Sequence, residues 1–303
     1  MQALLLPDRP HPECEPLTCT RPLGDCPVAN LPLRAQVRGE LESAGFDLTT
    51  APPAGLALYL LDSAWLPATD LAPLDRLARP TRVLAPGGAL LGWVGESAAP
   101  PAADAPAVTA AQAVAVVYAW DLLRVNEALV NRQERSLIRG HLSDRATVDG
   151  ALELGVGSVV LPGVYVEGSV IVGRDCKVGP NCYLRGPTAI GDGCHVGQAV
   201  ELKASILYER VGAGHLSYVG DSIIGARSNL GAGTITANLR HDGKNHRSQV
   251  GDALVDTGRR KFGVILGDDV HTGIHTSFYP GRKLWPGTST RPGAVVEKDG
   301  RGG

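Results

Sequence analysis

Aliphatic residues recur every six positions through the middle of the chain. The series starts at Val148 and reaches Leu202 without a miss, through Leu154, Val160, Val166, Val172, Val178, Leu184, Ile190 and Val196. Glycine follows several of these residues, and a small or β-branched residue lies four positions after most of them. This period predicts a parallel β-helix in which three hexads form one triangular coil. Each aliphatic side chain then points into a narrow core, and the coils stack about 4.8 Å apart.

Three of the six cysteines fall in the small-residue position of the repeat, at Cys176, Cys182 and Cys194. We expect them to pack in the corners of the triangle, with Cys176 and Cys194 stacked on adjacent coils. The six cysteines together lack the spacing of a zinc site. The pattern therefore favours free thiols and predicts no metal.

The repeat is interrupted twice and then resumes. Twenty-two residues separate Leu202 from Ile224, which we interpret as about four extra residues, and a long excursion follows from Asn238 to Phe262. Insertions in repeat proteins gather on one face, often the binding face. The positions that keep the period after the first break are Ile224, Leu230, Leu266, Thr272, Phe278, Leu284, Thr290 and Val296.

The first hundred or so residues show a different pattern. Apolar runs predict strands, and Leu33, Val37 and Leu41 lie on one face of a predicted helix, with Gly45 as its C-terminal cap. Strand, helix, strand and hairpin in this order indicate a small α/β domain. The predicted strands cover residues 2–6 and 56–61, and the predicted hairpin pairs residues 82–85 with residues 89–94.

A Pro/Ala-rich connector at residues 97–106 leads into a predicted connecting helix. Thr109 and Gln112 form a possible capping box for that helix. Its apolar face would carry Tyr118, Leu122, Val125 and Leu129. The predicted organisation is an α/β domain at 1–108, a connecting helix at 109–143 and a β-helix domain at 144–303.

Composition narrows the class of protein. The chain has 303 residues and a formal net charge of −2, so its charge favours neither nucleic acid nor a membrane as partner. The apolar run near Met1 is too short for a signal peptide, and no stretch reaches about 18 apolar residues. We expect a soluble, cytoplasmic protein whose partners are small molecules.

Residues 17–47 resemble the start of sugar-1-phosphate nucleotidylyltransferases, through Thr20-Arg21-Pro22, Pro27-Val28-Ala29-Asn30 and Pro32-Leu33. Where that family has a glycine-rich phosphate loop, this chain has three prolines, which lack N–H donors. Leu23 replaces the family's lysine. No convincing carboxylate pair for Mg²⁺ is visible, and the domain is short for the family. The resemblance therefore implies a truncated, degenerate nucleotidylyltransferase-like domain.

A second resemblance covers roughly residues 183–300. The stretches VELK, AGHLSYVGDSIIGARSNLGAGTITANLRHDGK and LGDDVHTG resemble the acetyltransferase domain of the bifunctional N-acetylglucosamine-1-phosphate uridylyltransferase/glucosamine-1-phosphate acetyltransferase family. This resemblance implies a left-handed β-helix, acetyl-CoA as co-substrate without a metal, and a homotrimer. It implies N-acetylation of an amino-sugar-1-phosphate, with glucosamine-1-phosphate as the first candidate.

The resemblance also assigns roles residue by residue. His215 takes the place of the catalytic base, because a neutral imidazole can accept the proton that the attacking amine loses. Arg185 and Lys203 take the places that bind the sugar phosphate. The remaining positions are Tyr218, Asn229 and Lys244, which orient the amino sugar, and Ala232 and Asn238, which lie near the acetyl group and coenzyme A.

The chain departs from the family at Leu239, where tyrosine is usual, and at Ile274, where serine is usual. The basic run Arg259-Arg260-Lys261 has two interpretations, a contact with coenzyme A phosphates or a solvated charge run. His271 and His275 raise a third chemistry, a zinc site, although their spacing does not fit zinc-dependent carbonic anhydrases. Two other functions stay open: a nucleotidylyltransferase, or a non-catalytic member that binds a sugar nucleotide.

Overall fold

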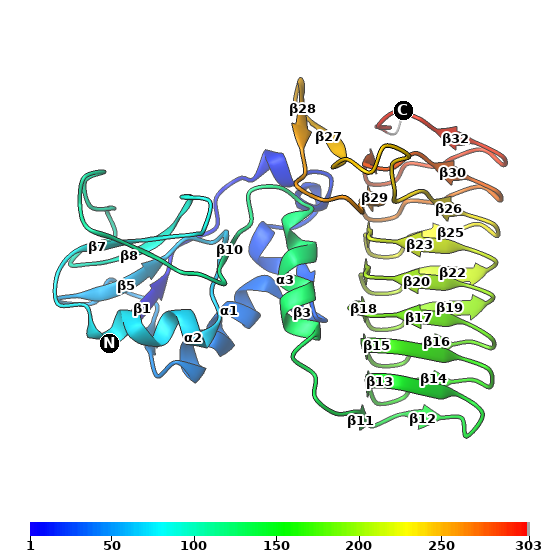
Figure 1. Cartoon of the computed structure of the whole chain (residues 1–303), viewed down its shortest axis with the longest axis horizontal. Coiled ribbons are helices and arrows are strands. Elements are labelled where there is room, and N and C mark those ends of the chain that lie inside the picture. Colours follow the sequence, from blue (N-terminus) through cyan, green and yellow to red (C-terminus); the bar gives the residue numbers. More distant parts are fainter. Residues whose placement is uncertain (302–303) are drawn as a thin grey trace. The chain divides into compact units, whose positions relative to one another are not determined.

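The computed structural model describes residues 1–301, so the last two residues of the predicted 144–303 domain lie outside the described part. The chain forms two compact units. The α/β unit comprises Met1–His11, Arg21–Cys26 and Leu31–Asp121. The β-helix unit comprises Pro12–Thr20, Pro27–Asn30 and Leu122–Gly303. The predicted fold class is confirmed, because a parallel β-helix follows a small α/β region (Figure 1).

The α/β unit is built on one mixed sheet with the strand order β4-β1-β5-β8-β7-β9. Strand β1 is parallel to both its neighbours, and β8 pairs antiparallel with β5 and β7. The six strands of this sheet are β1 (Gln2–Leu5), β4 (Asp47–Thr49), β5 (Ala57–Leu60), β7 (Thr81–Leu84), β8 (Leu90–Gly95) and β9 (Ala107–Thr109). The unit also contains the short strands β3 (Leu31–Pro32), β6 (Ala64–Trp65) and β10 (Val114–Ala115), which lie outside this sheet. Its helices are the 3₁₀ turn η3 (Leu23–Asp25), α1 (Leu33–Ser43), α2 (Ala68–Leu71) and the 3₁₀ turn η4 (Ala72–Arg76).

The apolar pattern predicted this unit well. All four residues of β5 are buried, and Tyr59 stacks on Trp93 of the neighbouring strand with ring centroids 5.8 Å apart. Helix α1 buries the predicted apolar face, and Gly45 ends it with a φ of +84°, a backbone conformation that glycine adopts without strain. The predicted strand, helix, strand and hairpin are confirmed.

The connecting helix is shorter than predicted. Helix α3 spans Asp121–Val130, whereas Thr109 ends strand β9, so the capping box of Thr109 and Gln112 does not form. The carboxylate of Asp121 instead accepts hydrogen bonds from the N–H groups of Val117 and Tyr118 at 3.1 and 2.9 Å. None of the helices within residues 1–301 is long and apolar enough to cross a lipid bilayer.

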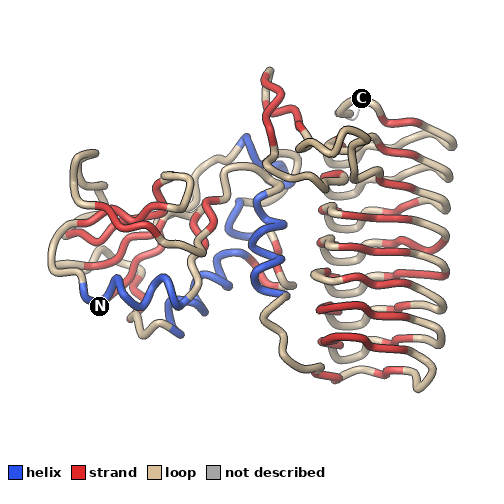
Figure 2. Tube along the Cα trace, viewed as in Figure 1, coloured by secondary structure: helices blue, strands red, loops and turns tan. Residues whose placement is uncertain are grey.

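The β-helix unit is a stack of triangular coils, and Figure 2 shows the short strands of successive coils lying one above another. We number the three sides of the triangle in chain order, with β13 (Thr147–Leu154) and β15 (Tyr165–Val172) spanning sides one and two. Side one continues in β17 (Tyr183–Arg185), β20 (Glu201–Lys203), β23 (Tyr218–Gly220), β26 (Ile235–Thr236), β30 (Ser277–Phe278) and β32 (Val295–Val296). Side two contains β11 (Leu137–Ile138), β18 (Thr188–Ile190), β21 (Ile206–Leu207), β24 (Ile223–Ile224), β29 (Val264–Leu266) and β31 (Arg282–Leu284). Side three contains β12 (His141–Leu142), β14 (Val159–Val160), β16 (Lys177–Val178), β19 (His195–Gln198), β22 (Gly212–His215) and β25 (Asn229–Leu230).

The predicted aliphatic series lines the core of this unit. Every member from Leu154 to Leu202 is buried, and Val148 is partly buried at the start of the stack. The predicted cysteines are also buried, and Cys176 and Cys194 lie on adjacent coils because Lys177 pairs with His195. Among the described residues, which include all six cysteines, no disulfide bond is formed.

The first interruption is not an insertion. The inward-facing residues continue from Leu202 through Leu207, Ala213 and Val219 to Ile224, at spacings of five, six, six and five residues. Two corners between sides one and two have thus each lost one residue, and the prediction of about four extra residues is wrong. The residues at these shortened corners, Ala204 and Asp221, have left-handed backbones with φ of +45° and +51°.

The second interruption is a real excursion. It leaves after side one and returns at the same corner, where β29 begins. Its middle is an antiparallel hairpin of β27 (Arg247–Val250) and β28 (Ala253–Asp256). Its two ends are tied together, because the N–H of Phe262 donates to the carbonyl of Asn238 at 3.0 Å.

Candidate active site

A buried ion pair occupies the corner between sides one and two. Lys203 ends strand β20, and Asp221 follows strand β23 on the next coil. The ammonium of Lys203 lies 3.0 and 2.9 Å from the two carboxylate oxygens of Asp221. An ammonium has three N–H donors, so this contact leaves one for a ligand.

Two more of the predicted residues join this ion pair, Asn238 directly and Tyr218 through Asn238. The Nδ2 amide of Asn238 donates to Oδ2 of Asp221 at 2.6 Å and to the hydroxyl of Tyr218 at 2.9 Å. Lys203, Tyr218 and Asn238 therefore form one hydrogen-bonded group around Asp221. We call these four residues the corner cluster.

The corner cluster perturbs the tyrosine within it. The pKa of Tyr218 is raised, first by burial and then by the negative charges of Asp221 and Glu201. Tyr218 thus keeps its proton at neutral pH, and its hydroxyl accepts the hydrogen bond from Asn238 while retaining one O–H to donate.

His215 lies around the next corner, three residues before Tyr218. It ends strand β22 on side three and is exposed to solvent. The chain then turns at Leu216, whose φ is +49°, and enters side one. The backbone carbonyl of His215 accepts hydrogen bonds from the hydroxyl of Ser217 at 2.8 Å and from the N–H of Gly233 at 3.4 Å. The Gly231-Ala232-Gly233 turn therefore lies on the coil next to His215.

Arg185 is the neighbour of Lys203 in the ladder of side one, but its charge is already shared. Arg185 pairs with Lys203 in register. Its guanidinium lies 3.0 Å from the carboxylate of Glu201 and 3.5 Å from that of Glu167, and it stacks over the ring of Tyr183 at 5.3 Å. A phosphate at this position would have to share the guanidinium with two carboxylates.

Two predicted residues lie elsewhere. Asn229 is on side three, in register with Gly212. Lys244 is exposed in the excursion, where its N–H donates to Asp242 at 3.2 Å. Within one chain, the structure does not bring either side chain into the corner cluster.

Sequence reasoning missed Asp221, the residue on which the cluster is built. Its signal was the Gly220-Asp221-Ser222 segment at a position where the repeat calls for a corner. The aliphatic spacing alone hid this corner, because the shortened coil looked like an insertion.

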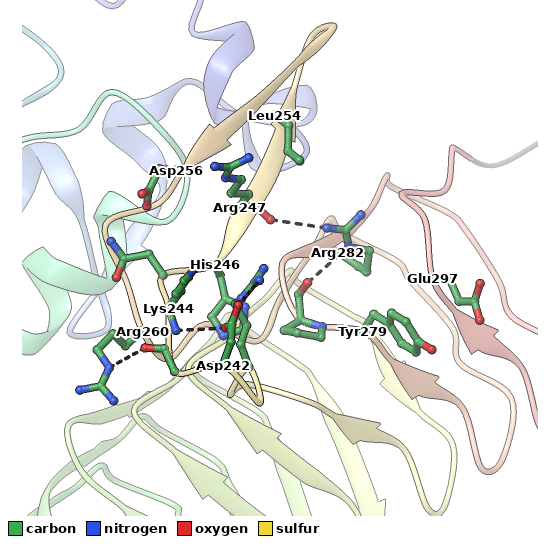
Figure 3. Close-up of a pocket in the computed structure, with 14 residues that line it drawn as sticks. Asp242, Lys244, His246, Arg247, Leu254, Asp256, Arg260, Tyr279, Arg282 and Glu297 are labelled. Atoms are coloured by element: carbon green, nitrogen blue, oxygen red, sulfur yellow. Dashed lines mark hydrogen bonds and ion pairs between the residues drawn. The ribbon is translucent and has the colours of Figure 1, made fainter.

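The excursion and the last coils enclose a pocket of about 840 Å³, which we call the basic pocket (Figure 3). Five cationic and three acidic side chains line it, together with the half-exposed ring of Tyr279. Its charged residues are Arg240, Asp242, Lys244, Arg247, Asp256, Arg260, Arg282 and Glu297. Three of the cations are engaged. Arg240 pairs with Asp242 at 2.7 Å, and Arg260 donates to the carbonyl of Gly243 at 3.0 Å. Arg282 donates to the carbonyls of Pro280 and Arg247 at 3.4 and 3.5 Å.

The basic run Arg259-Arg260-Lys261 does not act as one charged patch. Arg259 is largely buried in an ion pair with Glu127 of helix α3, whereas Arg260 lines the basic pocket and Lys261 is exposed. Leu239 and Ile274, the two positions that depart from the family pattern, both have exposed side chains.

The histidines considered for zinc do not form a cluster. The ring of His275 lies against Gly233, and His271 is an exposed residue in register with Asn229. In residues 1–301, no group of three or more His, Cys, Asp or Glu side chains is arranged to hold a metal ion.

The α/β unit has a small cavity beyond the carboxyl ends of β1 and β5, the place where open α/β sheets bind ligands. Its volume is about 160 Å³, below the roughly 300–1,000 Å³ typical of ligand pockets. Its polar lining is self-paired, because Arg34 lies 2.7 Å from Asp8.

Comparison with known proteins finds similarity over the β-helix part of the chain. The family model of the GMPPB C-terminal domain matches residues 159–278. A bifunctional sugar-1-phosphate nucleotidylyltransferase/acetyltransferase of Sulfurisphaera tokodaii is 37% identical over 180 residues, which are 59% of this chain and 45% of that protein. The predicted resemblance is confirmed over this part of the chain.

Other relatives carry the name bifunctional protein GlmU. The one from Methanococcus maripaludis strain C7 is 46% identical over 182 residues, which are 60% of this chain and 44% of that protein. The chain thus spans less than half the length of these curated relatives. A solved structure of GDP-perosamine N-acetyl transferase from Caulobacter crescentus aligns with 97% of this chain and 92% of that protein, at 12% identity. The TM-score of 0.20 is too low for this match to bear on function.

Proposed function

We propose that the chain is an acetyl-CoA-dependent N-acetyltransferase that acts on an amino-sugar-1-phosphate, with glucosamine-1-phosphate as the first substrate to test. The observation that carries this proposal is the corner cluster. The family resemblance selected Lys203, Tyr218 and Asn238, and these residues form one hydrogen-bonded group around the carboxylate of Asp221. Tyr218 lies three residues along the chain from His215.

His215 serves as the general base in this proposal. The lone pair of the sugar amine attacks the thioester carbonyl carbon, and His215 takes the proton that the amine loses. The carbon–sulfur bond then breaks, and the proton returns from the imidazolium to the departing thiolate of coenzyme A. A backbone N–H in the adjacent Gly231-Ala232-Gly233 turn can stabilise the oxyanion.

Lys203 supplies the charge that holds the sugar phosphate. Because Asp221 fixes its ammonium, the remaining N–H donor points from a defined position, and Arg185 lies beside it on the same ladder. Asn229 and Lys244 lie apart from this cluster. A homotrimer in which neighbouring copies complete the site accounts for them, and the flat sides of a triangular prism suit three-fold packing.

The α/β unit is proposed to have lost nucleotidylyltransferase activity. Prolines at positions 7, 10 and 12 remove N–H donors where a phosphate loop is needed, and the cavity beyond β1 is too small for a nucleotide. The measurement is pyrophosphate release from UTP or dTTP with a sugar-1-phosphate and Mg²⁺. Turnover in that assay would contradict this part of the proposal.

The acetyltransferase proposal is tested by release of coenzyme A from acetyl-CoA with glucosamine-1-phosphate. We expect His215→Ala to lose at least about a hundredfold in rate, within the usual range for a general base. His141→Ala is the matched control, because His141 is also an exposed histidine of side three, at the start of the β-helix. No turnover of wild type with glucosamine- or galactosamine-1-phosphate would favour a non-catalytic binding role instead.

A further inference from the structure

Asp221 links Lys203 on the coil to the start of the excursion at Asn238. Its carboxylate is buried and accepts hydrogen bonds from Lys203 on the coil and from Asn238 at the start of the excursion. The ammonium contacts both carboxylate oxygens, and the amide of Asn238 shares Oδ2 with it. The position of the ammonium and the start of the excursion are thereby fixed by one carboxylate.

The backbone of Asp221 fixes the other end of the excursion. Its N–H donates to the carbonyl of Lys203 at 2.7 Å, and its carbonyl accepts from the N–H of Gly263 at 2.9 Å. Gly263 is the residue at which the excursion rejoins the coil. Asp221 therefore holds Lys203 and both ends of the excursion.

We propose that Asp221 is a positioning residue, which fixes the ammonium of Lys203 for the sugar phosphate and anchors the 238–262 excursion over the same corner. The identity of the ligand rests on the proposed function. The anchoring role does not, because it follows from the contacts of Asp221 alone. Asp221 is not assigned a contact with the reacting atoms.

Two substitutions remove the carboxylate without straining the corner. The φ of +51° at Asp221 lies in the left-handed region, which asparagine and glycine tolerate better than other residues. Asp221→Asn replaces one oxygen by an amide nitrogen, so the ammonium of Lys203 loses its counter-charge. Asp221→Gly removes the side chain and with it the contact to Asn238.

A double-mutant cycle tests the action through Lys203. In the wild-type background, Asp221→Asn is expected to lower kcat/KM for the amino-sugar phosphate about tenfold or more. In a Lys203→Met background, the same change is expected to cost less than about twofold, because residues that act as a unit are not additive. Equal losses in both backgrounds would overturn the positioning role.

Asp268→Asn is the matched control for this cycle. Asp268 is another buried carboxylate of the β-helix, which accepts from the N–H of Ala226 at 2.9 Å and lies 3.5 Å from Arg227. It flanks a different corner. We expect its loss to leave kcat/KM unchanged, whereas a tenfold kinetic loss here would mean that any buried corner carboxylate has this effect.

Hydrogen exchange tests the anchoring role without any need for turnover. Asp221→Gly is expected to speed amide exchange within residues 238–262 at least tenfold, while Asp268→Asn leaves it unchanged. Unchanged exchange in Asp221→Gly would overturn the anchoring role even if the chain proves to be an active acetyltransferase. Faster exchange in a chain without turnover would retain it while the proposed function fails.

Discussion

Two corners of the same β-helix hold the same kind of ion pair in opposite surroundings. At the corner between sides two and three, Arg174 lies 2.8 Å from Asp192, with side chains 71% and 43% exposed. At the corner between sides one and two, Lys203 lies 2.9 Å from Asp221, with side chains 15% and 5% exposed. The distances are nearly equal, and burial is what differs.

Burial distinguishes the ion pair in the proposed active site from ion pairs that only line a corner of the β-helix. An exposed pair such as Arg174–Asp192 is screened by water and contributes little, although it repeats along the stack, as in Arg227–Asp269 at 2.7 Å. A buried ion pair costs desolvation free energy and is retained only when its hydrogen bonds are satisfied. Asn238 supplies such a bond to the carboxylate of Asp221. A corner whose only role is to turn the chain would gain no stability from a buried ion pair that offsets its desolvation cost.

Removing the cation from each ion pair should have very different effects on stability at the two corners. Lys203→Met leaves the Asp221 carboxylate buried without its counter-charge, so we expect the free energy of unfolding to fall by about 3–5 kcal/mol. Arg174→Met should leave it nearly unchanged, because both partners are exposed. Thermal and denaturant unfolding of the two variants measures this, and equal losses would contradict the distinction.

The second prediction concerns the double variant Lys203→Met/Asp221→Asn. Removing both charges abolishes the unpaired buried carboxylate, so this variant should be more stable than Lys203→Met alone, by about 2 kcal/mol. The same denaturant titration measures it. A double variant that is less stable than Lys203→Met would mean that the carboxylate is stabilised by neighbours other than the lysine.

Acid should loosen the excursion at the buried corner and leave the exposed corner alone. Burial lowers the pKa of His246, whose Nε2 lies 2.9 Å from the carbonyl of Asn238. When the excursion opens, His246 becomes solvated and binds a proton more readily than in the folded state. The neutral histidine therefore stabilises the closed excursion above the ordinary histidine pKa of about 6.5, and this stabilisation is lost as the pH falls below that value. We expect proteolysis within residues 238–262 to be faster at pH 5.5 than at pH 7.5.

His246→Gln is the control for that pH effect. Glutamine keeps an N–H donor for the carbonyl of Asn238 but does not titrate in this range. The variant should therefore lose the difference between the two pH values. A persistent difference would assign the acid sensitivity to another group.

The smallest expected effect is that of salt. At 1 M NaCl the Debye length is about 3 Å, so the exposed corner should lose what little its ion pair contributes. Asp192→Asn is then expected to melt at the same temperature as wild type in high salt, while Lys203→Met still melts below it. Melting curves at low and high salt measure the contrast, and a loss of the Lys203→Met effect in high salt would contradict the buried character of its pair.

The regular part of the fold was readable from the sequence because one physical rule repeats. A narrow core accepts an aliphatic side chain every six residues, and the positions from Leu154 to Leu202 obeyed that rule. The rule failed where a corner lost a residue, because the period alone cannot tell a shortened corner from an insertion. The predicted length of the connecting helix was too great for a related reason. Strands β9 and β10 precede the helix, and they are too short to show a period in the sequence.

The candidate site was likewise predictable only in part from the sequence. The roles of Lys203, Tyr218 and Asn238 came from resemblance, and their convergence on Asp221 required the stacking register of the coils. Asn229 and Lys244 were selected by the same resemblance, yet one chain keeps them apart from the cluster. Which residues share a site depends on the coil and side that carry them, and sequence distance gives neither.

We propose that the buried corner belongs to the active site and that the exposed corner does not. The most direct measurement is kcat/KM for glucosamine-1-phosphate in Lys203→Met and in Arg174→Met, with acetyl-CoA saturating and each variant shown to be folded. We expect a loss of at least about a hundredfold for Lys203→Met, since a misplaced substrate alone can cost that much, and no change for Arg174→Met. Wild-type activity in a folded Lys203→Met variant would contradict it.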